Sequence, residues 1–338
     1  IENNLADELL TWDQVRVRFG DRVGLAEDDK INSIDYQAYL ASKGPEIDFN
    51  PTKIAVINIQ GPIFLGTEGF GSTSADTAIQ LIREARKSEN VAGIVVRVDS
   101  PGGSAFASEM IRLELELAQI DGIPVVASFA SVAASGGYWL SATSDYIVAE
   151  PNSVTGSIGV FSVLFTAEKA LDKLGIHSDG IATTPFSLTD PFKSPSKSLN
   201  EALQLSVEHG YTQFVELVAK GRRLEIEQVE PLSQGKVWLG VEAVENGLAD
   251  ELGSLPKALL KAAELAEVDD WSPLYMKKPV DPRDAFLAEL LKTAQLQTIV
   301  PGYVRQAMSF TDLDMVMNQI QQGNKLQALC EPCLSGLR

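Results

Sequence analysis

Apolar runs and amphipathic stretches alternate along the first half of the chain. The apolar runs are short and rich in β-branched residues, which predicts buried strands, and helical spacing of apolar positions between them predicts helices. The predicted strands are 53–60, 91–98, 123–129 and 146–149, and the predicted helices are 74–87 and 105–119. Such alternation is typical of an α/β protein with a parallel sheet and right-handed crossovers.

The remaining sequence divides around this α/β region. Further helices would cover the sheet, and they are expected at 198–220, 240–246 and 255–266. We therefore place one domain at 51–270. The preceding segment 1–50 is acidic and locally helical (5–16 and 33–41), and amphipathic stretches in 271–338 predict a C-terminal helical extension.

A serine stands on a sharp turn in the stretch 131–139, SVAASGGYW. The stretch follows the predicted strand at 123–129 and opens a segment expected to be helical over 134–142. Ser135 would then lie near the positive end of a helix dipole, which favours developing negative charge. The glycines after it let a substrate backbone approach closely. Ser135 is therefore a candidate nucleophile, although a helix start with small residues is also ordinary packing.

A second turn, DSPGGS at 99–104, follows the predicted strand at 91–98. Gly102 and Gly103 lead into the predicted helix at 105–119. Glycine leaves backbone N–H groups unobstructed, which is what an oxyanion hole needs. Two glycines alone fit an ordinary strand-turn-helix connection, but a serine turn one βα unit later makes the pair more specific.

Three motifs in this order resemble the signal peptide peptidase A family: DSPGGS at 99–104, AASGGY at 133–138 and VTGSIGV at 154–160. The match is to the C-terminal half of the long, two-halved form and runs from about Thr52 to the end. The family consists of membrane-anchored bacterial serine proteases. The resemblance implies a Clp protease/crotonase-like fold, an α/β parallel sheet with covering helices, and it implies no metal or organic cofactor.

The resemblance also implies roles for individual residues. Ser135 would be the nucleophile, and the amides of Gly103 and Gly136 would hold the oxyanion. Gly102 would shape the turn or lend a further amide. Ser157 stands where the family uses a hydroxyl to orient a lysine amine, and a helix N-cap is an alternative and compatible role for it.

The general base is the part of the site that the sequence does not supply. His177 and His209 have no triad context and are interpreted as surface or packing histidines. The family uses a lysine, which serves as a base when burial lowers its pKa. In short family members this lysine lies some fifty residues after the serine, where this chain has Phe186 or Ser187. Neither side chain can accept the proton.

Two lysines lie just downstream of that position. Lys193 and Lys197 fall in a polar, proline-containing approach to the next helix, which favours a solvated loop with ordinary lysines. In the long form the resemblance implies that the N-terminal half carries the lysine and the C-terminal half the serine. We therefore expect this chain to be weak or inactive alone, with 1–50 as the helical connection from the missing half.

Charge, hydropathy and cysteine content limit the partners, membrane segments and metal sites that the chain could have. The chain has 338 residues, with 28 basic and 46 acidic residues and a net charge of −18, which argues against nucleic acid or anionic lipid as a direct partner. No apolar stretch approaches a transmembrane length, no signal peptide opens the chain, and a start at Ile1 fits a fragment or processed product.

Cys330 and Cys333 form a lone CxxC, which is a weak signal for a zinc site. Ordinary thiols or a local disulfide are favoured for these two cysteines.

The expected function is hydrolysis of short hydrophobic peptides, notably cleaved signal peptides. The resemblance implies a bacterial inner-membrane protein whose peptidase domain faces the periplasm. It also implies a partner in the N-terminal half and a bowl-shaped homo-oligomer, a tetramer. Two alternatives remain: a crotonase-type acyl-CoA enzyme, which would use Gly103 but not Ser135, and an assembly half without activity of its own.

Overall fold

The computed structural model describes two units of the chain, Ile1–Phe49 and Asn50–Arg338. The described residues are 7–26, 30–43, 51–66, 71–164, 166–178, 192–277 and, in backbone only, 327–329. The smaller unit contains helices α1 (Trp12–Val23) and α2 (Tyr36–Lys43). The larger unit contains the sheet and the two turns singled out above.

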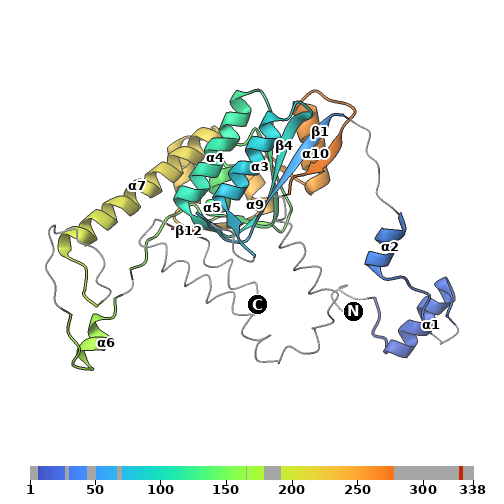
Figure 1. The fold of residues 1–338 in the computed structure, drawn as a ribbon, viewed down its shortest axis with the longest axis horizontal. Coiled ribbons are helices and arrows are strands. Elements are labelled where there is room, and N and C mark those ends of the chain that lie inside the picture. The colour runs from blue at the N-terminus through green and yellow to red at the C-terminus, as the bar shows by residue number, and fades with distance from the viewer. Residues whose placement is uncertain are drawn as a thin grey trace, which may run out of the picture. The chain divides into compact units, whose positions relative to one another are not determined.

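A mostly parallel sheet forms the centre of the larger unit (Figure 1). The strands in their spatial order are β10 (Glu251–Leu252), β7 (Tyr146–Ala149), β6 (Val125–Ala134), β4 (Val91–Ser100), β1 (Lys53–Gln60) and β11 (Ser272–Tyr275). Neighbours along this path pair in parallel. A branch extends from the end of β6, where β8 (Val154–Gly156) pairs in parallel with β6 and β9 (Val237–Leu239) pairs antiparallel with β8. The α/β class with a parallel sheet is confirmed.

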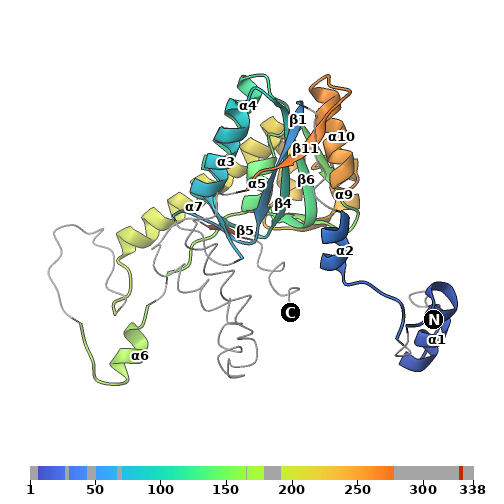
Figure 2. The same ribbon diagram turned by 45° about the vertical axis from the view of Figure 1, so that its right-hand side comes forward.

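Both faces of this sheet are buried, because helices cover each of them. Alternate residues of β1 point to opposite faces: Ile54 and Val56 pack with α10 (Leu255–Leu265), whereas Ile57 packs in the core on the side of α3 (Ala75–Lys87) and α4 (Ala105–Ile120). Figure 2 shows α10 on one side of the sheet and α3 and α4 on the other.

The remaining helices of the larger unit follow the core strands. They are α5 (Gly136–Ser141), α6 (Glu168–Asp172), α7 (Lys197–Arg222), α8 (Ile226–Val229), the 3₁₀ turn Glu230–Leu232 and α9 (Gly240–Glu245). Serine caps define several helix starts: Ser74, Ser104 and Ser196 each accept a hydrogen bond from a backbone N–H in the first turn of α3, α4 and α7. None of the helices within the described ranges is both long and apolar enough to cross a membrane.

A second, smaller sheet lies beside the diglycine turn. Its strands in order are β12 (Gln327–Leu329), β5 (Gly102–Ser104), β2 (Ile63–Phe64) and β3 (Thr73–Ser74). β12 runs antiparallel to β5, with Ala328 opposite Gly103. On the other side Ile63 pairs with Gly103 in parallel. Gly103 is thus the middle residue of a strand that is paired on both edges.

Several predicted boundaries need correction. β6 continues to Ala134 instead of ending at 129, and α5 begins at Gly136. α1 begins at Trp12, not at residue 5, because Thr11 and Gln14 form a capping box there. Within 271–338 the described pieces are strands: β11 joins the central sheet next to β1, and β12 pairs with β5. The amphipathic stretches that predict a C-terminal helical extension lie outside the described residues, so the extension stays a prediction.

Candidate active site

Ser135 occupies the single-residue turn between β6 and α5. Its backbone has φ 54° and ψ −114°, a conformation that costs a non-glycine residue about 1–3 kcal/mol. Hydrogen bonds on both sides hold it: Ser135 N–H donates to the Gly156 carbonyl at 2.8 Å, and Trp139 N–H donates to the Ser135 carbonyl at 2.7 Å. The surrounding structure therefore imposes the strain, as in the nucleophile turn of many hydrolases.

Further contacts brace the elements on either side of this turn. The Thr155 hydroxyl donates to the Ala133 carbonyl at 2.7 Å, which ties β8 to the end of β6. On the α5 side, the Tyr138 hydroxyl donates to the Leu248 carbonyl at 2.8 Å. Burial raises the pKa of Tyr138, so this hydroxyl keeps its proton at neutral pH.

The Ser135 side chain lies inside this frame without a partner. Ser135 is 1% exposed, and its Oγ has no hydrogen-bond partner among the described residues. Burying a hydroxyl without a hydrogen-bond partner lowers the stability of the folded state by about 1–3 kcal/mol, because the group loses its hydrogen bonds to water. Ser108 Oγ and Ser144 Oγ are also unpartnered, but Ser135 is the serine placed on a strained turn at a strand end. Ser135 Oγ is therefore the one of these three hydroxyls that we assign to contact with a substrate or a base.

The diglycine turn has a shape that only glycine permits. Gly102 and Gly103 have φ of 99° and 153°, and a Cβ on Gly103 would lie 2.2 Å from the Ile63 carbonyl oxygen. Gly102 N–H donates to Ser100 Oγ at 3.1 Å. The Gly102 amide is thus paired within the turn, and which of its two expected roles Gly102 has stays a prediction.

The two turns lie next to each other at the carboxyl ends of β4 and β6. Ser100 at the end of β4 pairs in register with Ala133, two residues before Ser135. Gly137 in α5 also packs closely against the end of β4, because a Cβ added to it would lie 2.9 Å from the Ser100 carbonyl oxygen. α5 and β5 accordingly contact each other, and Figure 2 shows them close together. The structure therefore brings Ser135, Gly136 and Gly103 into one neighbourhood.

Ser157 borders the same neighbourhood from β8. Gly156 pairs with Ala134, and Ser157 follows directly with φ 48° and little exposure. No helix begins at Ser157, so the N-cap interpretation is wrong. Its N–H donates to the Lys236 carbonyl at 2.7 Å. No sequence motif singles out Lys236. Its amine donates to the Pro231 carbonyl at 2.8 Å.

None of the described basic side chains forms a hydrogen bond with Ser135 Oγ. His177 is exposed in the loop after α6, not at a strand start, and its Nδ1 lies 3.1 Å from Asp172 Oδ1. His209 is exposed on α7. Lys197 is 91% exposed at the start of α7, with Nζ 3.7 Å from a Glu201 oxygen.

Lys193 is half-buried in the approach to α7. Several residues of interest lie outside the described ranges: Phe186, Ser187, Cys330 and Cys333.

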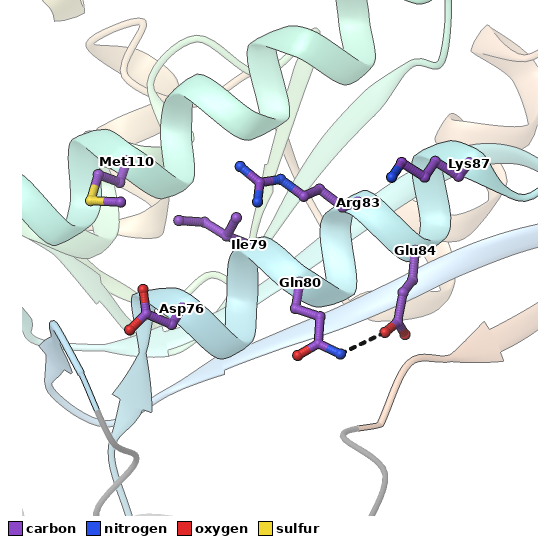
Figure 3. A pocket seen from close by; sticks show the side chains of 7 residues that line it. All are labelled: Asp76, Ile79, Gln80, Arg83, Glu84, Lys87 and Met110. Atoms are coloured by element: carbon purple, nitrogen blue, oxygen red, sulfur yellow. Dashed lines mark hydrogen bonds between the residues drawn. The ribbon is translucent and has the colours of Figure 1, made fainter.

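A pocket of about 480 Å³ lies elsewhere, on the outer side of α3 (Figure 3). Long polar side chains and two apolar ones line it: Asp76, Ile79, Gln80, Arg83, Glu84, Lys87 and Met110. The drawn side chains share one hydrogen bond, from Gln80 to Glu84 at 2.8 Å. This pocket contains no hydroxyl nucleophile and no glycine turn, so we do not assign the site to it.

A strained serine at a strand-to-helix turn, beside a diglycine turn, is the arrangement of α/β hydrolytic enzymes with a serine nucleophile. The model of peptidase family S49 matches residues 118–269, a range that includes this serine turn. The putative protease MJ0651 of Methanocaldococcus jannaschii is 34% identical over 240 residues, 68% of this chain and 76% of that protein. Together with the family match, this relative shows that the chain belongs to peptidase family S49. The expected Clp protease/crotonase-like fold is thereby confirmed.

The similar proteins include two named Protease 4. That of Haemophilus influenzae is 44% identical over 244 residues, which make up 72% of this chain and 40% of that protein. That of Salmonella typhi is 39% identical over 334 residues, 98% of this chain and 53% of that protein. The chloroplastic serine protease SPPA of Arabidopsis thaliana is 32% identical over 276 residues, 79% of this chain and 40% of that protein. The chain thus spans about half or less of the length of these relatives.

Proposed function

We propose that this chain carries the nucleophile and the oxyanion hole of a serine peptidase that cleaves short hydrophobic peptides, including signal peptides after their release. The observation that carries the proposal is Ser135, which is buried and strained and lies next to the Gly103 turn in a chain of family S49, with no partner for its Oγ among the described residues. The names of the long relatives, Protease 4 and serine protease SPPA, support peptide hydrolysis over acyl-CoA chemistry.

In this proposal Ser135 Oγ attacks the carbonyl carbon of the scissile peptide bond. The amides of Gly103 and Gly136 donate hydrogen bonds to the oxygen that becomes negative. The C–N bond then breaks, and the amine leaves with the proton that the base took from Ser135. Water, deprotonated by the same base, hydrolyses the acyl-serine and restores the hydroxyl.

The base in this proposal is a lysine amine from outside the chain, held in place by Ser157. Two observations support this origin. Ser135 Oγ has no hydrogen-bond partner within the described ranges, and this chain matches only 40% of one long relative and 53% of the other. A lysine brought against the buried Oγ would lose solvent, which lowers its pKa and leaves it neutral more often.

The surroundings of Ser135 support an apolar substrate. Ala133 and Ala134, just before the turn, and Ile158, two residues after β8, are buried, and the partly exposed Val132 packs against Ala134. These side chains offer no hydrogen bonds from polar atoms. We extend the proposal to a bacterial inner-membrane enzyme with its peptidase domain facing the periplasm, where cleaved signal peptides are available.

We also propose that the enzyme assembles with copies of itself, as a tetramer. The exposed face of α4 supports self-association, since four large apolar side chains follow one another there at helical spacing: Phe106, Leu113, Leu117 and Ile120. Sedimentation of the two-halved enzyme at several concentrations tests the assembly, and a monomer at every concentration would contradict it.

The substrate class can be tested with two compounds. The chain, together with the N-terminal half of the two-halved form, is given a fluorogenic peptide with a hydrophobic core and, separately, an acyl-CoA thioester. We expect hydrolysis of the peptide and covalent labelling of Ser135 by a serine-directed phosphonate. Turnover or saturable binding of the thioester without peptide hydrolysis would favour the crotonase-type alternative. No labelling with both halves present would favour a non-catalytic assembly half.

A further inference from the structure

Each of the two turns of the candidate site, the diglycine turn and the serine turn, leads directly into a helix. Gly103 is succeeded by Ser104, the N-cap of α4, and Ser135 is the N-cap of α5. The separation between the oxyanion amide and the nucleophile therefore depends on how α4 and α5 are held together. A displacement of about 1 Å at reacting atoms can lower a rate by about a hundredfold, so such a contact has catalytic consequences.

A side-chain hydrogen bond joins these two helices near their N-termini. The Trp139 indole Nε1 in α5 donates to Glu109 Oε2 in α4 at 2.7 Å. Trp139 is buried, and its ring packs against Phe214 of α7 with ring centroids 4.5 Å apart. The backbone N–H of the same Trp139 donates to the Ser135 carbonyl. Trp139 is thus bonded both to the nucleophile residue and to α4.

Glu109 is itself fixed by Arg112, one turn later on α4. Arg112 Nε and Nη2 donate to the two oxygens of Glu109, each at 2.8 Å, and Nη1 donates to Glu116 Oε2 at 3.0 Å. Burial alone would raise the pKa of Glu109, but the hydrogen bonds from Arg112 and Trp139 outweigh it and lower the pKa. Glu109 is therefore a carboxylate with a fixed orientation at neutral pH.

We propose that Glu109 and Trp139 form a positioning clasp that sets the spacing between the Gly103 amide and Ser135. The inference rests on the proposed function of these two turns. Neither side chain takes part in the chemistry: they act through the starts of α4 and α5. Loss of the clasp lowers kcat and leaves KM nearly unchanged, because it misplaces reacting groups without removing contacts to the bound peptide.

The test uses four variants in the two-halved enzyme with a hydrophobic fluorogenic peptide. Trp139→Phe removes the donor and keeps a ring to pack against Phe214, and Glu109→Ala removes the acceptor. We expect each to lower kcat by about ten- to a hundredfold, with KM within about twofold. Glu109→Gln keeps an acceptor oxygen and should recover most of the loss.

Glu116→Ala is the matched control. It also removes one carboxylate from Arg112, but Glu116 lies a further turn along α4 and no described contact joins it to Trp139. We expect it to keep kcat within about twofold, even if melting temperatures fall. Equal kcat for Glu109→Ala and Glu116→Ala would overturn the clasp, and so would equal losses in Glu109→Gln and Glu109→Ala.

If Glu109→Ala does not fold, Trp139→Phe and Glu109→Gln decide the question. Wild-type kcat in a folded Trp139→Phe protein would overturn the clasp. Failure of the proposed function gives a different pattern, since wild-type activity would then survive Ser135→Ala. If Ser135→Ala removes activity and the clasp variants leave kcat unchanged, the clasp is wrong and the nucleophile assignment remains.

Discussion

The serine turn and the approach to α7 differ in how firmly they hold their side chains. At residues 133–139, backbone groups are bonded to β8 and within α5, the Tyr138 and Trp139 side chains reach other elements, and Ser135 is 1% exposed. At the start of α7, by contrast, Lys197 is 91% exposed and its one recorded ion pair is a long one within the same helix. Exposed ion pairs of this kind contribute little to stability and hold their side chains only weakly in place.

The contrast separates two requirements of the reaction. A nucleophile needs a fixed position relative to the oxyanion donors. At Ser135 the backbone is held in a strained conformation, which would fix the position of the hydroxyl. A base needs a lowered pKa and contact with the nucleophile. Lys197 does not meet the second condition, because Ser135 Oγ has no hydrogen-bond partner among the described residues and the Lys197 amine lies 3.7 Å from a Glu201 oxygen. In our proposal the chain supplies the geometry for attack, and the proton acceptor comes from elsewhere.

The largest expected effect comes from Ser135→Ala in the two-halved enzyme. Removing the nucleophile should lower peptide turnover by about 10⁶-fold, to the background rate. Because Ser135 Oγ has no described hydrogen-bond partner, we expect the melting temperature to stay the same or rise. Peptide hydrolysis and thermal unfolding measure the two effects. Hydrolysis that persists in the folded variant would remove Ser135 from the mechanism.

A smaller loss is expected from Gly103→Ala. The new Cβ would lie 2.2 Å from the Ile63 carbonyl oxygen, so β5 must shift and carry its amide away from the oxyanion. We expect turnover to fall by about 10²–10³-fold, as for loss of an oxyanion donor. Gly122→Ala is the control, since Gly122 also has a positive φ (84°) but open space around it. Comparable turnover in the two variants would refute the assignment of Gly103.

Substrate preference tests the apolar side of the serine turn. A peptide with a charged residue at the cleavage position must bury that charge beside Ala134 and Ile158, which costs several kcal/mol without a partner. We expect kcat/KM for it to be at least about a hundredfold below that for an alanine or valine peptide. A profile led by charged residues would contradict the proposed pocket.

Tyr138→Phe should have the smallest effect, on stability. It leaves the Leu248 carbonyl without its donor, which costs about 1 kcal/mol. Because burial raises the pKa of Tyr138 above its usual 10, wild-type stability contributed by this group is present below pH 10 and lost as pH rises further. Chemical denaturation at pH 7 and pH 11 should therefore show a smaller difference between the proteins at pH 11. An equal difference at both values would exclude this linkage.

Local patterns were enough to predict most elements of the sheet. The boundaries of β1 were predicted correctly because an apolar run occupies 54–57, Ile59 continues it, and Gly61-Pro62 ends it. The serine turn was predicted because glycines follow a strand. β11 was missed, since Ser272–Tyr275 contains a proline and mostly exposed side chains, and only its place at the sheet edge makes it a strand.

Contacts between distant segments had no local signal. Glu109 and Trp139 are 30 positions apart on different helices, so nothing in either segment predicts their hydrogen bond. The N-cap prediction for Ser157 failed because pairing of β8 with β6 and β9, not a helix, determines the backbone there. The strain at Ser135 likewise depends on the Gly156 carbonyl, 21 residues later in the sequence.

The most direct test of the central claim compares the isolated chain with the reconstituted enzyme. Hydrolysis of a hydrophobic peptide is measured for the chain alone and after addition of the N-terminal half of the two-halved form. A general base contributes about 10²–10⁴ to the rate, so we expect a gain of that size when the lysine is supplied. Full activity of the isolated chain, lost on Lys193→Ala or Lys197→Ala, would show instead that the base is local.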